Sequence, residues 1–119
     1  MSYENQQIND TIVAGMDLSA YQYKFVTVAG SLGTSNANAY GVLKNKPLAN
    51  EHATVTINGL TKIKAGGAIA AGGKFKVSSG FAIAVASGDG VPIGTAKTAA
   101  ASGDTFVGNI NTANCHTST

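Results

Sequence analysis

The sequence lacks the residues that most often cross-link or strongly charge a small protein. Its 119 residues include one cysteine, Cys115, so no disulfide can form within the chain. It contains no arginine, and the formal net charge of +2 at pH 7 comes from eight lysines set against six acidic residues. Because bidentate contacts to guanine and close phosphate contacts favour the guanidinium group, this composition argues against nucleic-acid recognition.

Long apolar runs are also missing. The longest, residues 81–86, is far shorter than the roughly 20 residues that a membrane-spanning helix needs, so we expect no membrane contact. The first fifteen residues include Glu4 and Asp10 and have no basic segment followed by an apolar one, so we expect no signal peptide.

The composition that remains favours β-strands around a thin core. Leucine occurs five times, whereas valine and isoleucine together occur 17 times and threonine 12 times, with 15 glycines between them. β-Branched side chains are stiff at χ1 and pack well on a pleated surface. Since 19 of the apolar residues are alanines, we expect added stability from subunit contacts or from docking on a larger body.

Turn-forming residues recur about every 8 to 12 positions, which is the spacing of an all-β sandwich or barrel. The sequence predicts an all-β fold, a small antiparallel β-sandwich or barrel of short strands. We divide the chain into a polar N-terminal arm (residues 1–10), a single β domain (11–111) and a polar C-terminal tail (112–119) that contains Cys115. The arm is predicted to be a free tail or an extended contact segment, and Tyr3 and Ile8, its only bulky apolar groups, are its candidate contact residues.

Two hairpins stand out in the pattern. Asn58-Gly59 follows an alternating segment and precedes residues 60–64, and Asn-Gly is a strong signal for a two-residue turn. A second turn at 78–80 joins strands in which Phe75, Val77, Phe81, Ile83 and Val85 are predicted to face the core. The remaining predicted strands are 11–14, 21–29, 40–43, 91–99 and 105–111, and the glycine-rich segment 65–73 is predicted to be a tight connector anchored by Ile69.

No motif carries catalytic or cofactor chemistry. Gly67 and Gly72 have the spacing of a phosphate-binding loop, but Gly73 stands where that loop requires lysine. Cys115 and His116 have no further ligands at a metal-binding spacing, and the acidic residues are scattered. We therefore expect no enzyme activity, no metal and no cofactor.

Three Lys-x-Lys pairs are the most suggestive feature of the sequence, because in a strand each pair places two ammonium groups on one face. Lysines on an edge strand commonly prevent edge-to-edge aggregation, which is one interpretation. The other is a basic face that docks on an acidic partner surface. The candidate contact residues are Lys44, Lys46, Lys62, Lys64, Lys74 and Lys76.

Residues 41–110 contain a series of short elements: Gly41-Val42-Leu43, Pro47, Gly59-Leu60-Thr61-Lys62-Ile63, Ala65-Gly66-Gly67-Ala68-Ile69 and Ile93-Gly94-Thr95-Ala96. With these elements the segment resembles the capsid decoration, or cement, proteins of tailed bacteriophages, and more narrowly a family of small phage proteins catalogued as a domain of unknown function. Gly73 departs from the pattern, because relatives tend to carry an acid there.

The resemblance implies a non-enzymatic virion protein that is made in the host cytoplasm and binds the outer surface of the phage head. Its partners would be the major capsid protein and itself, as a homotrimer, and it would clamp neighbouring capsid subunits and so stabilise the expanded shell. An alternative function is a small surface module that binds carbohydrate or adheres to the host surface, which would require exposed aromatic side chains around a cleft.

Overall fold

The computed structural model describes residues 8–35, 38–85 and 92–111, and the described chain contains strands and no helix. All strand pairings are antiparallel, which confirms the predicted all-β class. The strands are β1 (Ile8–Val13), β2 (Phe25–Val26), β3 (Gly41–Leu43), β4 (His52–Lys64), β5 (Lys74–Ser78), β6 (Phe81–Ala84), β7 (Gly94–Ala96) and β8 (Thr105–Asn111).

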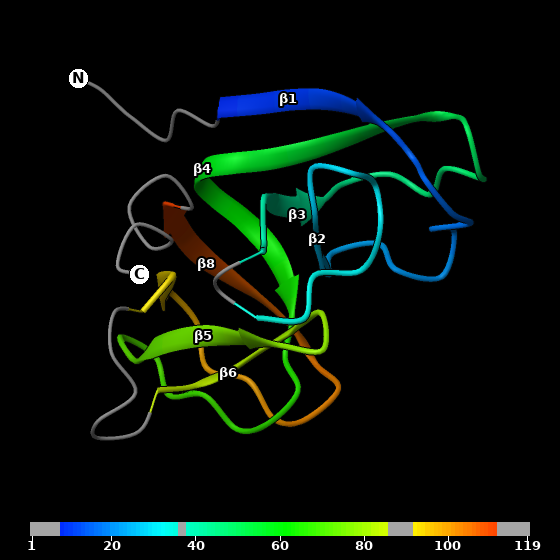
Figure 1. The fold of residues 1–119 in the computed structure, drawn as a ribbon. Coiled ribbons are helices and arrows are strands. Elements are labelled where there is room, and N and C mark those ends of the chain that lie inside the picture. The colour runs from blue at the N-terminus through cyan, green and yellow to red at the C-terminus, as the bar shows by residue number, and fades with distance from the viewer. Residues whose placement is uncertain (1–7, 36–37, 86–91, 112–119) are drawn as a thin grey trace.

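The predicted turn at Asn58-Gly59 is wrong, because these residues lie inside the 13-residue strand β4. Gly59 has a φ of +106°, and β4 bends sharply along its length (Figure 1). The first half of β4 pairs with β1 and β3, and the second half pairs with β8; Asn58 is the one residue that pairs with both β1 and β8. The backbone freedom that glycine offers to a turn is used here to bend a strand between two sets of partners.

The second half of β4 belongs to a small barrel. The strands follow the order β4-β8-β7-β5-β6, and a parallel bridge between Ala65 and Ala82 brings β6 back beside the end of β4. The Gly66 N–H donates to the Ala82 carbonyl at 2.8 Å, so the sheet is nearly closed. Of the two architectures left open by the sequence, the structure has the barrel-like one.

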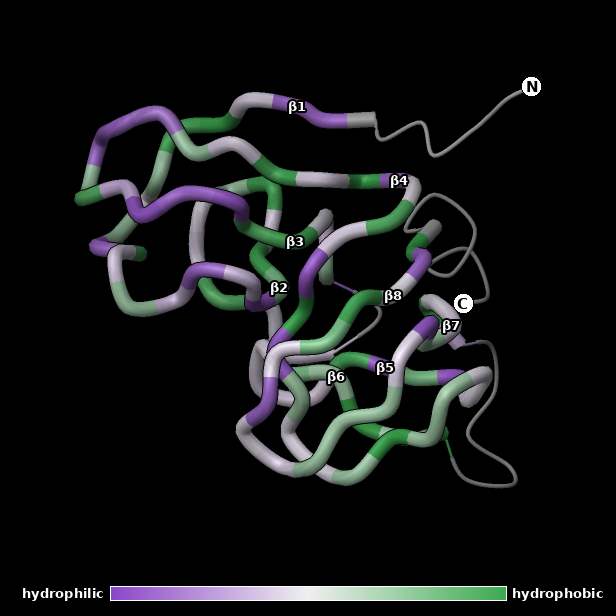
Figure 2. Tube along the Cα trace, turned by 180° about the vertical axis from the view of Figure 1, so that it is seen from behind, coloured by the Kyte–Doolittle hydropathy of each residue, from purple (hydrophilic) through white to green (hydrophobic). Residues whose placement is uncertain are grey.

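Two apolar clusters lie on opposite sides of β2 and β3. The barrel core contains Phe75 and Phe106, whose ring centroids are 5.4 Å apart in an edge-to-face arrangement. The smaller cluster, which includes Leu18 and Val55, lies on the other side. Phe25 and Val42 face the first cluster, whereas their neighbours Val26 and Leu43 face the second. Apolar segments appear along each of these strands when the chain is coloured by hydropathy (Figure 2).

The hairpin of β5 and β6 is confirmed, with Ser79 and Gly80 at the turn and both at positive φ. The prediction that the apolar side chains of both strands face the core holds for β5 but is wrong for β6. A two-residue turn pairs Ser78 with Phe81 and Val77 with Ala82, so Ala82 joins the buried side and Phe81 moves to the other face. Ile83 shares that outer face, because side chains alternate along a strand.

Other predicted elements differ mainly in length. Only Phe25–Val26 of the predicted strand 21–29 is extended, because Tyr23 has a φ of +69° and residues 21–24 form a turn. The connector keeps its predicted form: Ile69 is 3% exposed and exchanges backbone hydrogen bonds with Ala100. Tyr3, residues 86–91 and the tail with Cys115 lie outside the described residues.

Strand β1 begins within the predicted arm, at Ile8 rather than at residue 11. The polar residues Asn9 and Asp10 are extended because β4 supplies their partners, Thr56 and Val55. The Thr56 hydroxyl donates to Asn9 Oδ1 at 2.8 Å, and the Tyr40 hydroxyl donates to the Asp10 carboxylate. Of the predicted free tail or extended contact segment, residues 8–10 are extended, and these side-chain hydrogen bonds hold them against β4 and Tyr40.

We predict that Gly59→Ala destabilises the protein by about 1–3 kcal/mol, because a side chain is strained at this φ. Urea unfolding followed by circular dichroism measures the change. Gly67→Ala is the matched control: its Cβ would meet nothing within 4 Å, and its effect should stay within about 0.5 kcal/mol. Equal effects of the two substitutions would contradict a special role for the bend.

The contact between Tyr40 and Asp10 predicts a dependence on alkaline pH. The hydrogen bond to Asp10, burial and the Asp10 charge raise the pKa of Tyr40 above its ordinary value of 10.0. The folded state therefore favours the protonated phenol, and this stabilisation is present below pH 10 and lost as pH rises through the raised pKa. The melting temperature of wild type should fall more than that of Tyr40→Phe across this range. Parallel curves for the two proteins would contradict the assignment.

Candidate functional site

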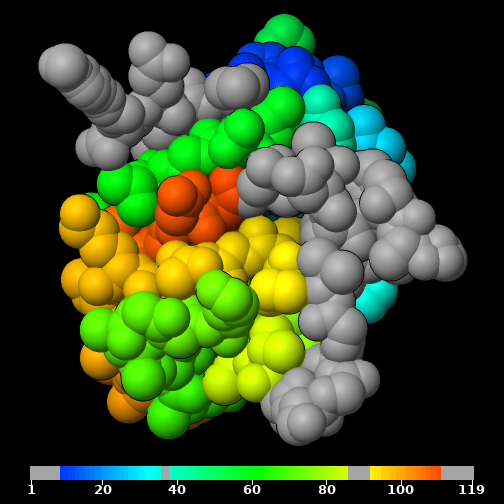
Figure 3. Space-filling view, turned by 90° about the vertical axis from the view of Figure 1, so that its left-hand side faces the viewer, coloured from blue at the N-terminus to red at the C-terminus, as the bar shows by residue number. Residues whose placement is uncertain are grey.

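Lysines of strand β4 and of the segment that follows β7 lie near one another on the outer face of the barrel. Ile63 points into the core, so its neighbours Lys62 and Lys64 point outward from β4. Lys62 pairs with Val107 of β8, and the Lys97 N–H donates to the Val107 carbonyl at 2.8 Å. Figure 3 shows β8 between β4 and the β7 segment on one side of the molecule, which matches the strand order. The barrel thus gathers lysines that are distant in sequence.

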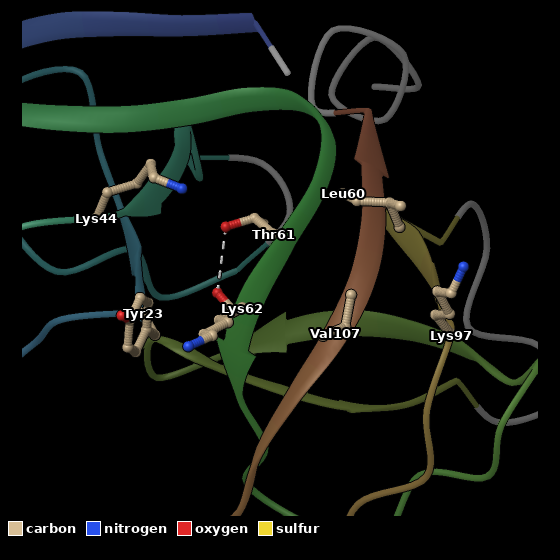
Figure 4. Close-up of a pocket in the computed structure, with 7 residues that line it drawn as sticks. All are labelled: Tyr23, Lys44, Leu60, Thr61, Lys62, Lys97 and Val107. Atoms are coloured by element: carbon tan, nitrogen blue, oxygen red, sulfur yellow. Dashed lines mark hydrogen bonds between the residues drawn. The ribbon is translucent and has the colours of Figure 1, made fainter. Parts of the chain in front are cut away.

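An open pocket of about 530 Å³ lies on this surface, and we call it the lysine pocket. Lys62 and Lys97 are exposed, and Lys44 is half-buried. In Figure 4, Tyr23, Lys44 and Lys62 lie to one side and Leu60, Val107 and Lys97 to the other. Its lining residues are Tyr23, Lys44, Leu60, Thr61, Lys62, Lys97 and Val107.

Tyr23 is fixed at the edge of this pocket by its backbone. Its N–H donates to the Leu43 carbonyl at 2.7 Å, and its carbonyl accepts from the Lys64 N–H at 2.9 Å. The positive φ of Tyr23 allows both bonds, which tie the turn to β3 and β4. The Lys62 ammonium lies 5.9 Å from the centre of the Tyr23 ring, within the range of a cation–π contact. Tyr23 therefore offers an aromatic wall beside a positive charge.

A second pocket, of about 280 Å³, shares Tyr23 and adds Lys46 and Lys64 to the surface. Gln22 also lines it and donates to the Lys44 carbonyl at 2.9 Å, which links the two pockets. A third pocket, beside β7, includes Lys74. We call the lysines of the three pockets the lysine face: Lys44, Lys46, Lys62, Lys64, Lys74 and Lys97.

The lysine face is suited to binding an anionic partner. No acidic residue is among the described residues that line the three pockets. Lysine ammoniums attract carboxylates as point charges, while Leu60 and Val107 offer an apolar floor for a neighbouring side chain. Within the described ranges, no three His, Cys, Asp or Glu residues are grouped so that they could hold a metal ion. No helix in that part of the chain is long and apolar enough to cross a membrane.

Lys62 and Lys64 share one face of β4, and Lys74 and Lys76 share one face of β5, as predicted, but the pockets group the lysines across these pairs. Lys44 and Lys62 line one pocket, Lys46 and Lys64 another, and Lys74 a third. Lys44 and Lys46 follow β3 rather than lying in a strand. Lys76 is half-buried and pairs with Ile83 of β6. Ile8 contributes its backbone to β1.

Sequence reasoning named only Lys44 and Lys62 of the seven residues that line the lysine pocket, and Lys97 and Tyr23 are the most consequential of the five it missed. Lys97 has no neighbouring lysine, so the Lys-x-Lys pattern could not reveal it. Tyr23 was assigned to a strand, and nothing in its sequence neighbourhood indicates a positive φ. Antiparallel pairing of the last two strands, which the sequence predicts, is the signal that could have placed Lys97 beside Val107.

The amino-acid sequence matches no protein-family model and no curated protein sequence. The fold is similar to that of the N base of the head fibre gp8.5 of bacteriophage phi29, with a TM-score of 0.66 and 16% sequence identity. The match covers 90% of this chain and 96% of that chain, so the likeness extends over nearly the whole of both folds.

The lysine face and Lys24 are predicted to differ in what they contribute to stability. The Lys24 ammonium lies 4.4 Å from the centre of the Phe81 ring and 5.0 Å from that of Tyr21. Lys24→Gln should therefore lower stability by about 0.5–2 kcal/mol. Lys62→Gln should change it by less than about 0.5 kcal/mol, because an exposed charge among like charges adds little. Urea unfolding at low salt compares the two, and a larger loss for Lys62→Gln would make the lysine pocket a stabilising element.

Proposed function

We propose that this chain is a structural protein of a phage virion that binds the outer surface of the head and clamps neighbouring subunits of the major capsid protein. The observation that carries the proposal is the fold shared with the phi29 head fibre base over 90% of the chain. In this proposal the protein is made in the host cytoplasm, binds the head as a homotrimer and performs no catalysis.

The lysine face supplies the attachment chemistry in this proposal. Five of the six lysines line the two pockets that share Tyr23, Lys74 lines the third, and the described pocket linings contain no carboxylate to neutralise them. A capsid surface that presents Asp and Glu side chains would be attracted over this whole area, and like-charged surfaces would be rejected. Leu60 and Val107 would then exclude water at the centre of the contact.

Binding of this kind stabilises the shell by linkage. A protein that binds only the expanded arrangement of capsid subunits lowers the free energy of that arrangement and leaves the other unchanged. The barrel needs no active site for this role, which agrees with the absence of catalytic motifs in the sequence.

The carbohydrate-binding alternative has weaker support. Sugar-binding clefts commonly combine several exposed aromatic faces, whereas Tyr23 is the only aromatic residue that lines the three described pockets. A lysine ammonium already lies near its ring. The surface chemistry therefore favours an acidic protein partner.

Binding to native heads that lack this protein tests the proposal. Lys62→Gln/Lys97→Gln should reduce head binding at least about tenfold, because two ammoniums of the lysine pocket are lost. Wild-type binding should weaken with added salt, and decorated heads should resist heating or osmotic shock better than bare heads.

Ala68→Glu/Ala84→Glu is the matched control, because it lowers the net charge by the same amount at exposed positions that line none of the three pockets. This control should bind like wild type. Equal losses of binding for both double variants would show that net charge, and not the lysine pocket, accounts for the attraction. A wild-type protein that neither binds nor protects heads would reject the proposal.

A further inference from the structure

A second surface has the opposite chemistry to the lysine face. Four large hydrophobic side chains are strongly exposed in the described part of the chain, with exposed fractions of 37–64%. Single exposed apolar residues are ordinary, whereas an exposed group of them often marks a contact surface. We call this group the apolar tip: Val13, Met16, Val28 and Leu48.

Hydrogen bonds hold the segments of the apolar tip together. The Gly15 N–H donates to the Gly30 carbonyl at 2.9 Å, joining the turn of Val28 to the end of β1. The Ala14 N–H donates to the Glu51 carbonyl, and the Asn50 N–H donates to the Ala14 carbonyl, joining the turn of Leu48 to the same segment. A Cβ at Gly30 would lie 2.3 Å from the Val13 carbonyl oxygen, so these turns pack closely.

Two carboxylates accompany these apolar side chains. Asp17 follows Met16 and accepts from the Ser19 N–H, which lowers the pKa of Asp17 from 3.8. Glu51 accepts from the Leu48 N–H at 2.8 Å, so its carboxylate lies at the base of the Leu48 turn. Asp17 and Glu51 therefore add two acidic side chains to the apolar tip.

The described chain also contains the complement of this tip. The lysine pocket has an apolar floor, Leu60 and Val107, and a rim of three lysines. We propose that the apolar tip of one copy docks in the lysine pocket of a second copy, with Leu48 over the apolar floor and with Asp17 and Glu51 beside the lysines. The two halves match in both charge and hydrophobicity, which is what a specific contact requires.

Such a contact is head-to-tail, because it joins two different surfaces of the same protein. Contacts of this type close into a ring or extend into a row. The capsid contact proposed above uses the same lysine pocket, so a second copy and the capsid surface would compete for it. The proposal concerns self-association and does not depend on binding to phage heads.

Charge reversal tests the contact with the protein alone. Asp17→Lys/Glu51→Lys reverses the tip, and Lys62→Glu/Lys97→Glu reverses the pocket. Sedimentation velocity at rising concentration should show assembly of wild type and at least about tenfold weaker self-association for each double variant. An equimolar mixture of the two should assemble again, because each reversed surface then meets its complement.

Leu48→Ser provides a variant that keeps both carboxylates, and circular dichroism checks that every variant is folded. Leu48→Ser should also weaken assembly, whereas the control Ala68→Lys/Ala84→Lys should not. A monomeric wild type, or a mixture of the reversed variants that fails to assemble, would overturn the head-to-tail contact. The tip variants retain the lysine face, so their binding to heads is measured separately from their loss of self-association.

Discussion

The bend of β4 at Gly59 is the constraint on which the other features of this fold depend. One 13-residue strand serves two structures, a sheet with β1 and β3 and a barrel with β8, and a single backbone direction could not satisfy both. The bend lets the second half of β4 curl until β6 returns beside Ala65. That curvature turns Lys62 and Lys64 outward together with Lys97, so the position of the lysine face follows from the bend.

The lysine face conflicts with what stability alone would favour. Like charges that share a surface repel one another, and neutral polar residues on the same outward positions would maintain the barrel equally well. The core that supports this face is thin, with three phenylalanines and mostly small or β-branched side chains around them. Concentrated positive charge above a thin core therefore fits the proposed binding role better than a role in folding.

Sequence reasoning succeeded where local chemistry decides the structure and failed where distant strands decide it. The turn at Ser79-Gly80 and the connector at Ile69 follow from local residues, and both are present. Asn58-Gly59 carries the same local signal, yet pairing with β1 and β8 holds it in a continuous strand. For the candidate site, the sequence predicts that lysines point outward from the strands. It does not predict which residues line the pocket, because Tyr23 and Lys97 are brought there by contacts between segments distant in sequence.

The placement of β2 and β3 between the two apolar clusters bears on how the molecule opens. These strands are only two and three residues long, yet both of their faces are buried. Separating either strand from its neighbours would expose both clusters at once, because Phe25 and Val26 belong to different ones. We therefore expect the two halves of the protein to unfold together, as one cooperative unit, rather than one after the other.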